Sequence, residues 1–252
     1  MNKKALWISV SGLDGSGKTT LVDNLEIWFK EKSLRVKRDR LPHDRYIVKE
    51  LLNESHDSYT DRLLFAVDNR IFGTKLKELL NSDKYDIILT QRCFLDSFVH
   101  GAVQGYSYSW IEDLNRIADL PKADVIIHMV AEAQTAYSRI CDDPDADKFE
   151  YPAYMRKQEA ETRRAYFECV SGKNPDLEPF NSAKHLYVDS TQMTTDEVFF
   201  IVKNKLEKLN LFWQKSQLQM KLGFVILLLF FIKNRFKYPF INQIWKNIFK
   251  DN

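Results

Sequence analysis

The chain has 252 residues, a length that a single α/β domain with a substantial core can fill. Its three cysteines are odd in number and widely spaced, which excludes a disulfide framework and paired zinc ligands and favours reduced thiols in the cytoplasm. The net charge of +2 conceals an asymmetry, because residues 209–252 hold seven basic residues and one acidic residue. The start of the chain runs directly into an apolar segment, so we expect no secretion signal.

Short apolar runs alternate with longer helical segments over residues 1–208. The predicted strands are Ala5–Val10, Leu34–Lys37, Asp86–Thr90, Asp124–Val130 and His185–Val188. The predicted helices are Lys18–Lys32, Tyr59–Leu80, Leu95–Gln104, Ser109–Ala118, Ala133–Ile140, Tyr151–Ser171 and Thr195–Leu209. This alternation is typical of βαβ units, whose parallel strands need helices on both faces. We therefore predict a three-layer α/β domain, residues 1–208, around a five-stranded parallel sheet.

A glycine-rich segment joins the first predicted strand to the first predicted helix. Gly12-Leu13-Asp14-Gly15-Ser16-Gly17-Lys18-Thr19 fits the pattern G-x-x-x-x-G-K-[ST] of a phosphate-binding loop. In such a loop the backbone N–H groups and the start of the helix face the phosphates of ATP. We expect Lys18 to contact the β- and γ-phosphates and Thr19 to bind Mg²⁺, with Thr20 in helix packing or phosphate contact. The alternative is an ordinary glycine turn before a helix.

The wording of this loop, Ser11-Gly12-Leu13-Asp14-Gly15-Ser16-Gly17-Lys18-Thr19-Thr20, resembles the G-x-D-G-x-G-K-T-T version found in thymidylate kinases. The resemblance implies a P-loop kinase fold, ATP and Mg²⁺ as cofactors, and a nucleoside monophosphate as acceptor. It also places Asp14 near the 3′-hydroxyl group of the acceptor. The alternative role of Asp14 is to support the turn.

Two further segments resemble acceptor-binding elements of the same family. Arg40-Leu41-Pro42 is similar to R-E-P, which implies that Arg40 binds the acceptor phosphate; the alternative is a solvated basic loop. The segment from Leu63 to Arg70 is similar to L-L-F-A-x-D-R, in which the phenylalanine stacks on the base and the arginine bonds to it. Phe65 matches, although a core position is the alternative. Asn69 holds the arginine position, four residues after Phe65 on the same helical face, and Arg70 is displaced by one.

The third predicted strand runs into Gln91-Arg92-Cys93-Phe94-Leu95-Asp96-Ser97, which resembles the family segment D-R-[YH]-x-x-S. The resemblance implies that Arg92 binds the acceptor phosphate. Gln91 replaces the aspartate that supports the magnesium site, so either Asp96 substitutes or the metal rests on Thr19 and ATP. Ser97 matches a base-contacting position, and a helix-start role is the alternative.

An acidic segment after the fourth predicted strand lies at the position of the family lid. Asp147-Lys148-Phe149-Glu150 looks like D-R-[FI]-E with lysine in place of arginine. Arg139 and Lys148 are the cations that can neutralise charge on the transferred phosphoryl group, although Lys148 lacks the bidentate fork of arginine. The alternative is a solvated acidic loop.

Residues 209–252 form a basic, aromatic-rich tail with an apolar run from Leu222 to Ile232. Eleven residues cover roughly 16 Å as a helix, against about 30 Å of hydrocarbon, so the run is too short to span a bilayer. Its basic and aromatic flanks favour peripheral contact with a membrane surface. The alternative is a helix packed on the domain or in a homodimer interface.

The function predicted from these features is ATP-dependent phosphorylation of a nucleoside monophosphate, dTMP to dTDP first among the acceptors. Two alternatives stay open: a kinase for another nucleotide or phosphorylated metabolite, and a membrane-associated nucleotide-binding protein with weak or no transfer activity. We expect a cytoplasmic protein, at the membrane surface if the tail binds lipid, with homodimerisation as an option and no nucleic-acid partner.

Overall fold

The computed structural model describes residues 5–44, 46–116, 120–142 and 148–209. Its contacts divide the chain into two units, residues 1–202 and 203–252. Within the second unit only residues 203–209 are described, so the predicted tail from residue 210 onward lies outside the described residues. In the part of the chain that is described, no helix has the length and apolar character needed to cross a bilayer.

A five-stranded parallel sheet forms the centre of the first unit, as predicted. Its strands are β1 (Leu6–Gly12), β2 (Val36–Arg40), β3 (Ile87–Gln91), β4 (Val125–Val130) and β5 (Lys184–Asp189). Their order in the sheet is β2-β3-β1-β4-β5, and every neighbouring pair is parallel. The central strands are apolar and buried on both faces, which parallel sheets covered by helices require.

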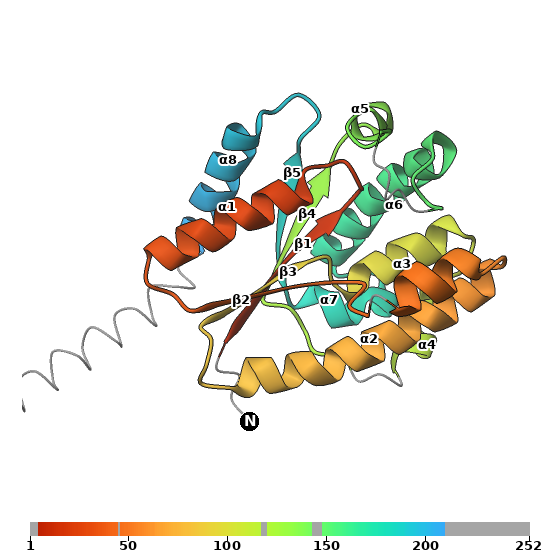
Figure 1. The fold of residues 1–252 in the computed structure, drawn as a ribbon, viewed down its shortest axis with the longest axis horizontal. Helices are drawn as coiled ribbons and strands as arrows, with labels where there is room; N and C mark the ends of the chain where they lie inside the picture. The colour runs from red at the N-terminus through yellow and green to blue at the C-terminus, as the bar shows by residue number, and fades with distance from the viewer. Residues whose placement is uncertain (1–4, 45, 117–119, 143–147, 210–252) are drawn as a thin grey trace, which may run out of the picture. The chain divides into compact units, whose positions relative to one another are not determined.

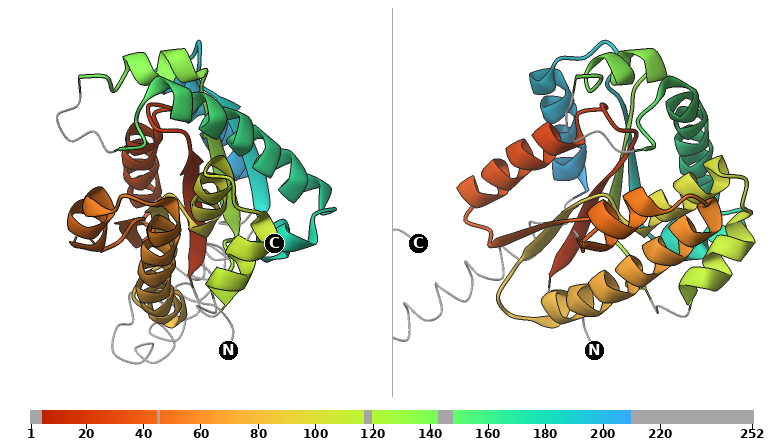
Figure 2. Two further views of the ribbon diagram at one scale, coloured as in Figure 1. Left: turned by 90° about the vertical axis from the view of Figure 1, so that its right-hand side faces the viewer. Right: turned by 45° about the vertical axis from the view of Figure 1, so that its right-hand side comes forward.

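Helices cover both faces of the sheet (Figures 1 and 2). They are α1 (Lys18–Glu31), η1, a π-helix (Tyr46–Leu52), α2 (Ser58–Asn81), α3 (Phe94–Val103), α4 (Tyr108–Arg116), α5 (Ala133–Ser138), α6 (Pro152–Ser171), η2, a 3₁₀ helix (Pro175–Leu177), α7 (Glu178–Asn181) and α8 (Thr195–Lys208). In Figure 1, α1 lies on one face of the sheet beside α8, and α2, α3 and α6 lie on the other. The three-layer prediction is confirmed.

The larger core lies between the sheet and the layer formed by α2, α3 and α6. Trp7 of β1 packs edge-on against Phe94 of α3 with ring centroids 5.4 Å apart, and its indole Nε1 donates to Thr90 Oγ1 at 2.9 Å. Ile88 and Ile126 point into the same cluster from the neighbouring strands. Because side chains alternate along a strand, the strand residues next to these point to the opposite face of the sheet, which α1 covers.

The strand order places the carboxyl ends of β1, β3 and β2 side by side. The connection after β1 leads to β2 at one edge of the sheet, and the connection after β3 leads toward the opposite edge, to β4, so the direction reverses between β1 and β3. Ligands of open α/β sheets bind in the crevice outside the carboxyl ends at such a point. The phosphate-binding loop, Arg92 and Arg40 all follow these strand ends, so the topology brings the predicted site residues together.

Candidate functional site

The loop between β1 and α1 needs glycine at two positions for steric reasons. Gly12 has φ +129°, and a Cβ there would lie 1.9 Å from the carbonyl oxygen of Met129. Gly15 has φ +73°, and its Cβ would lie 2.1 Å from the carbonyl oxygen of Ala136 on α5. A side chain at either position would push the loop away from β4 or α5.

The loop delivers backbone donors to an anion site. Gly17, in the left-handed conformation, forms the N-cap of α1 and provides no side-chain cap. The first N–H groups of α1 therefore depend on another acceptor, and the helix dipole favours a negative one. These features fit the phosphates of ATP. The Ser190 hydroxyl donates to the Ser16 carbonyl oxygen at 2.9 Å and ties the loop to the segment that follows β5.

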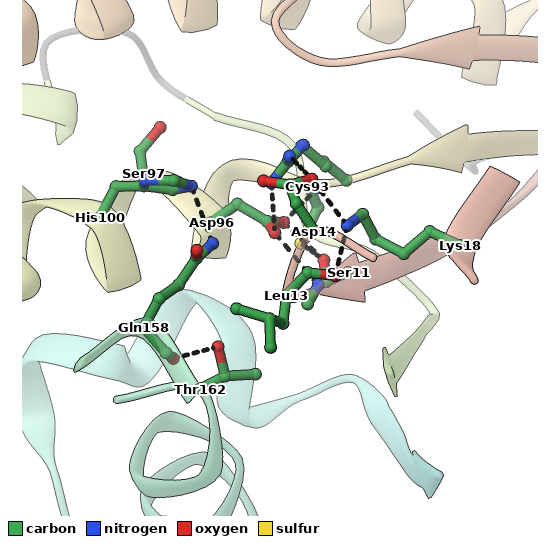
Figure 3. A network of polar contacts seen from close by, with 12 residues as sticks. Ser11, Leu13, Asp14, Lys18, Cys93, Asp96, Ser97, His100, Gln158 and Thr162 are labelled. Atoms are coloured by element: carbon green, nitrogen blue, oxygen red, sulfur yellow. Dashed lines mark hydrogen bonds and ion pairs between the residues drawn. The ribbon is translucent and has the colours of Figure 1, made fainter. Parts of the chain in front are cut away.

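Two cations of the site share one carboxylate. Lys18 Nζ donates to the Leu13 carbonyl oxygen at 2.7 Å and to Asp14 Oδ1 at 3.1 Å, and Arg92 forms an ion pair with the same oxygen. Figure 3 shows the Lys18 and Asp14 side chains turned toward each other. Burial raises the pKa of Asp14, but the charges of Arg92 and Lys18 outweigh it and hold that pKa well below its usual value. Burial also lowers the pKa of Lys18, and Asp14 opposes this effect.

Arg92 has an unusual backbone conformation. Its φ is +71°, a region that non-glycine residues rarely adopt and that costs about 1–3 kcal/mol. Its N–H donates to the Val10 carbonyl oxygen at 2.8 Å, so the chain leaving β3 bends over the end of β1. The bend directs the guanidinium toward Asp14 and the phosphate-binding loop.

The two residues predicted to bind magnesium, Thr19 and Asp96, lie in different surroundings. Thr19 Oγ1 donates to Gln91 Oε1 at 3.3 Å, so an amide oxygen stands beside the hydroxyl where a carboxylate was expected. Both are hard oxygen donors that suit Mg²⁺, which often keeps waters and substrate phosphates as its other ligands. Among the described residues no group of three or more His, Cys, Asp or Glu side chains can hold a metal ion.

Asp96 lies behind the loop rather than beside Thr19. Its carboxylate accepts from the Ser11 hydroxyl at 2.7 Å, the Gly12 N–H at 3.2 Å and the Cys93 N–H at 2.9 Å (Figure 3). The last of these bonds belongs to the capping box at the start of α3. These three bonds occupy most of the hydrogen-bonding capacity of the carboxylate, and its predicted metal role stays a prediction.

A cavity of about 910 Å³ runs from the phosphate-binding loop to α2 and α3. It is lined by most of the predicted site residues: Asp14, Gly15, Ser16, Gly17, Lys18, Thr19, Thr20, Arg40, Phe65, Asn69, Arg92, Asp96, Ser97 and Arg139. A volume of this order suits a small-molecule site. Sequence segments spread over 125 residues therefore meet in one space.

In the part of the cavity formed by α2 and α3, the Phe65 ring contacts two polar side chains. The Arg62 guanidinium lies 4.4 Å from the centroid of the Phe65 ring, and the His100 ring is nearly parallel to it with centroids 6.2 Å apart. Burial, followed by the charge of Arg92, lowers the pKa of His100 well below its ordinary value, so this imidazole is neutral at pH 7. Neither residue was predicted for the site: Arg62 lies one turn before Phe65 on α2, and His100 is brought to Phe65 by the packing of α3 against α2.

Three predicted residues, Gly12, Arg70 and Lys148, do not line this cavity. Arg70 is exposed, because one helical step beyond Asn69 turns its side chain about 100° away from the buried face of α2. Lys148 Nζ donates to Asp61 Oδ1 at 2.7 Å and to the Ser55 carbonyl oxygen at 3.0 Å, and it lines a separate cavity of about 460 Å³.

Arg139 lies at the loop but binds backbone oxygens. Its guanidinium donates to the carbonyl oxygens of Gly15 at 3.2 Å and Ser190 at 3.0 Å. The side chain thus braces the loop against the segment after β5. The remainder of the predicted acidic segment, residues 143–147, lies outside the described residues.

Comparisons with known proteins agree with this geometry. The family model described as thymidylate kinase matches residues 10–177. A protein of Sulfurisphaera tokodaii named probable thymidylate kinase is 31% identical over 170 residues, which cover 67% of this chain and 84% of the relative. The protein of the same name from Methanothermobacter thermautotrophicus is 29% identical over 173 residues, covering 66% of this chain and 81% of the relative. The family match spans the phosphate-binding loop, Arg40, Phe65 and Arg92, and the chain belongs to the thymidylate kinase family.

Proposed function

We propose that this protein transfers the γ-phosphoryl group of ATP to dTMP and forms dTDP. The observation that carries the proposal is the single cavity in which the phosphate-binding loop and Lys18 face Arg92 and Phe65. One space thus holds donor-binding groups at one end and acceptor-binding groups at the other. The relatives named probable thymidylate kinase support the choice of acceptor.

The chemistry requires positioning rather than a general base. A phosphate oxygen of the acceptor attacks the γ-phosphorus of ATP in line, the bond from that phosphorus to the β,γ-bridging oxygen breaks, and ADP leaves. Thr19, with Gln91 beside it, would hold Mg²⁺ together with ATP, and the ion would neutralise charge on the phosphates. Lys18 and the first N–H groups of α1 bind the phosphates of ATP.

On the acceptor side, Arg40 and Arg92 bind the phosphate group of dTMP, and Asp14 lies where the family places the 3′-hydroxyl group. Phe65 stacks on the base, and Asn69 and Ser97 line the wall next to it. Arg139 and Lys148 supply the remaining positive charge. In the structure both are engaged with oxygen acceptors, so either must change partners to reach the transferred group.

One observation favours a second candidate, a nucleotide-binding protein with weak transfer activity. Gln91 gives Thr19 an amide oxygen without negative charge, and Mg²⁺ binds carboxylates more strongly than amides. A kcat within the range typical of kinases, about 1–100 per second, on dTMP or another monophosphate rejects this candidate.

We also propose that the protein forms a homodimer through α2. Tyr59, Leu63, Val67 and Ile71 recur every four residues along this helix and are 39–52% exposed, which leaves an apolar stripe on its outer face. The predicted cytoplasmic location and membrane-surface contact of the tail are retained as proposals on the basic and aromatic composition of residues 210–252 alone.

A panel assay tests the proposed function. The purified full chain is incubated with ATP, Mg²⁺ and each of dTMP, dUMP, dCMP, dAMP and dGMP, and ADP formation is followed with time. We expect the highest kcat/KM for dTMP. Equal or higher turnover with a purine nucleotide contradicts the proposed acceptor, and no turnover above the rate with ATP alone contradicts the proposed reaction.

A further inference from the structure

Three buried polar side chains form a hydrogen-bonded row behind the base end of the cavity. Asn115 of α4, Asn69 of α2 and Ser97 of α3 are 3%, 1% and 7% exposed. Asn69 Nδ2 lies 2.7 Å from Asn115 Oδ1 and 3.0 Å from Ser97 Oγ. Asn69 and Ser97 both line the cavity with Phe65.

A backbone carbonyl fixes the direction of every bond in this row. Asn115 Nδ2 lies 2.8 Å from the Ile111 carbonyl oxygen, which can only accept, so the oxygen of the Asn115 amide must face Asn69. Asn69 therefore presents its nitrogen to Asn115. The second hydrogen of that nitrogen is directed at Ser97 Oγ, which makes the serine oxygen an acceptor.

This orientation leaves the Ser97 hydroxyl hydrogen available. No described residue accepts a hydrogen bond from Ser97 Oγ, whose only side-chain partner is Asn69. The same orientation leaves Asn69 Oδ1 buried without a partner among the described residues. A buried polar group without a hydrogen bond lowers the stability of the fold by about 1–3 kcal/mol. Contacts of the Asn69 nitrogen, rather than of its oxygen, therefore determine how the amide is placed.

We propose that Asn69 is a positioning residue that makes the Ser97 hydroxyl a hydrogen-bond donor to the acceptor base. Phe65 and Asn69 lie four residues apart on one face of α2, so a base stacked on Phe65 presents its edge toward the row. A donor at this wall matches the ring carbonyl of thymine or uracil. It opposes the amino group of cytosine, which is itself a donor at the same ring position. The row thus selects pyrimidines with an oxo group, and this inference rests on the proposed function.

The matched substrates for the test are dUMP and dCMP, since they differ at this edge of the base alone. For the full chain and for variants, kcat and KM are measured with dTMP, dUMP and dCMP. We expect wild-type kcat/KM to favour dUMP over dCMP by about 10- to 100-fold, because a buried donor left unmatched loses about that factor. In Asn69→Asp the carboxylate has no hydrogen to give, so Ser97 donates to it and turns its lone pairs toward the base. The dUMP to dCMP ratio should then fall at least about 10-fold, mainly through KM.

Four further variants test whether the change in the ratio comes from the row. Ser97→Ala should also reduce the ratio, and in that background Asn69→Asp should change it no further. If Asn69→Asp does not melt cooperatively, Asn69→Leu, which removes the donor without adding charge, should lower the ratio about 10-fold. Asn81→Asp makes the same chemical change at an exposed position of α2 and should leave the ratio as in the wild type.

The results separate this inference from the proposed function. A wild type that phosphorylates dTMP, together with an unchanged dUMP to dCMP ratio in Asn69→Leu and Ser97→Ala, overturns the role of the row and leaves the kinase function standing. A wild type that phosphorylates no pyrimidine monophosphate overturns both.

Discussion

Asp14 is the residue that links the two cations of the site. Its carboxylate pairs with Lys18 and Arg92, which are the proposed phosphate-binding cations. Phosphate oxygens offer these cations the same kind of partner, so binding can exchange one set of ion pairs for another without exposing a buried charge. The carboxylate also opposes the effect of burial on Lys18, because it raises the pKa of the ammonium group that burial lowers.

The two roles of Asp96 can be separated by Asp96→Asn. The asparagine amide cannot accept from Ser11, Gly12 and Cys93 as a carboxylate does, so we expect the melting temperature to fall by several degrees. We also expect lower activity that excess Mg²⁺ restores in part, since the site already lacks a carboxylate at Gln91. Activity and melting temperature are measured at 1 and 20 mM Mg²⁺, both about physiological or above for a Mg²⁺ enzyme.

The exposed Asp83→Asn substitution is the control and should change neither quantity. Loss of activity that follows the melting temperature, with no response to Mg²⁺, would show that Asp96 serves only as a helix cap and loop support. Unchanged activity at every Mg²⁺ level would leave the metal to Thr19 and ATP.

At the scale of elements, α2 has distinct faces with different roles. Phe72, Leu76 and Leu80 are fully or nearly buried in the core, and Asn69 is buried at the cavity. The apolar stripe of Tyr59, Leu63, Val67 and Ile71 lies on the exposed face. A dimer through this stripe would therefore lie one helix diameter, about 10 Å, from the base-binding wall.

The proposed dimer is tested by placing a charge on the stripe. Val67, 50% exposed, is replaced by Glu, and the control is Val170→Glu on α6, where the valine is 55% exposed. We expect the wild type and the control to have the mass of a dimer by light scattering, and Val67→Glu to have that of a monomer, because a buried unpaired carboxylate is costly. A monomeric wild type would contradict the proposal, and so would dissociation by Val170→Glu alone.

Most helix and strand positions could be predicted because their apolar periodicity is strong. The predicted Tyr59–Leu80, for example, is observed as Ser58–Asn81, and Thr195–Leu209 as Thr195–Lys208. The π-helix η1 and the short α7 were not predicted. Both are stabilised by their surroundings rather than by a repeating pattern: Leu52 packs with Phe149 and Tyr154, and Phe180 packs edge-on against Phe98.

At the scale of the whole molecule, buried histidines link stability to pH. Burial lowers the pKa of His128 to about 3, with His185 contributing, and burial lowers the pKa values of His100 and His185 as well. Below a pH of about 6.5 the unfolded chain binds protons at these positions and the folded chain does not, so stability falls as the pH falls. For His128 this loss of stability continues as the pH falls from about 6.5 to about 3.

We expect the free energy of unfolding to decrease by about 2 kcal/mol through His128 alone between pH 7.5 and 5. Urea unfolding at both pH values measures it. His128→Gln can keep the bond to His185 without titrating, and its decrease should be smaller by that amount. The same decrease in the variant and the wild type would show that His128 does not set the pH dependence.

The site was predictable where a local motif carries it. Lys18, Arg92, Phe65 and Ser97 line the cavity because each follows a strand end or faces inward from a helix beside it. The row that begins at Asn115, and His100 beside Phe65, depend on how α2, α3 and α4 pack, which no local pattern records. The engagement of Lys148 with Asp61 likewise depends on residues 87 positions apart.

Stoichiometric product analysis tests phosphoryl transfer to dTMP most directly. The purified full chain is incubated with dTMP, ATP and Mg²⁺, and ADP and dTDP are quantified together by ion-exchange chromatography. We expect the two products to form in equal amounts, and Lys18→Ala, which removes the ammonium group at the loop, to lose both while it still melts cooperatively. ADP without dTDP, or an undiminished yield from Lys18→Ala, would contradict the assignment of this cavity as a thymidylate kinase site.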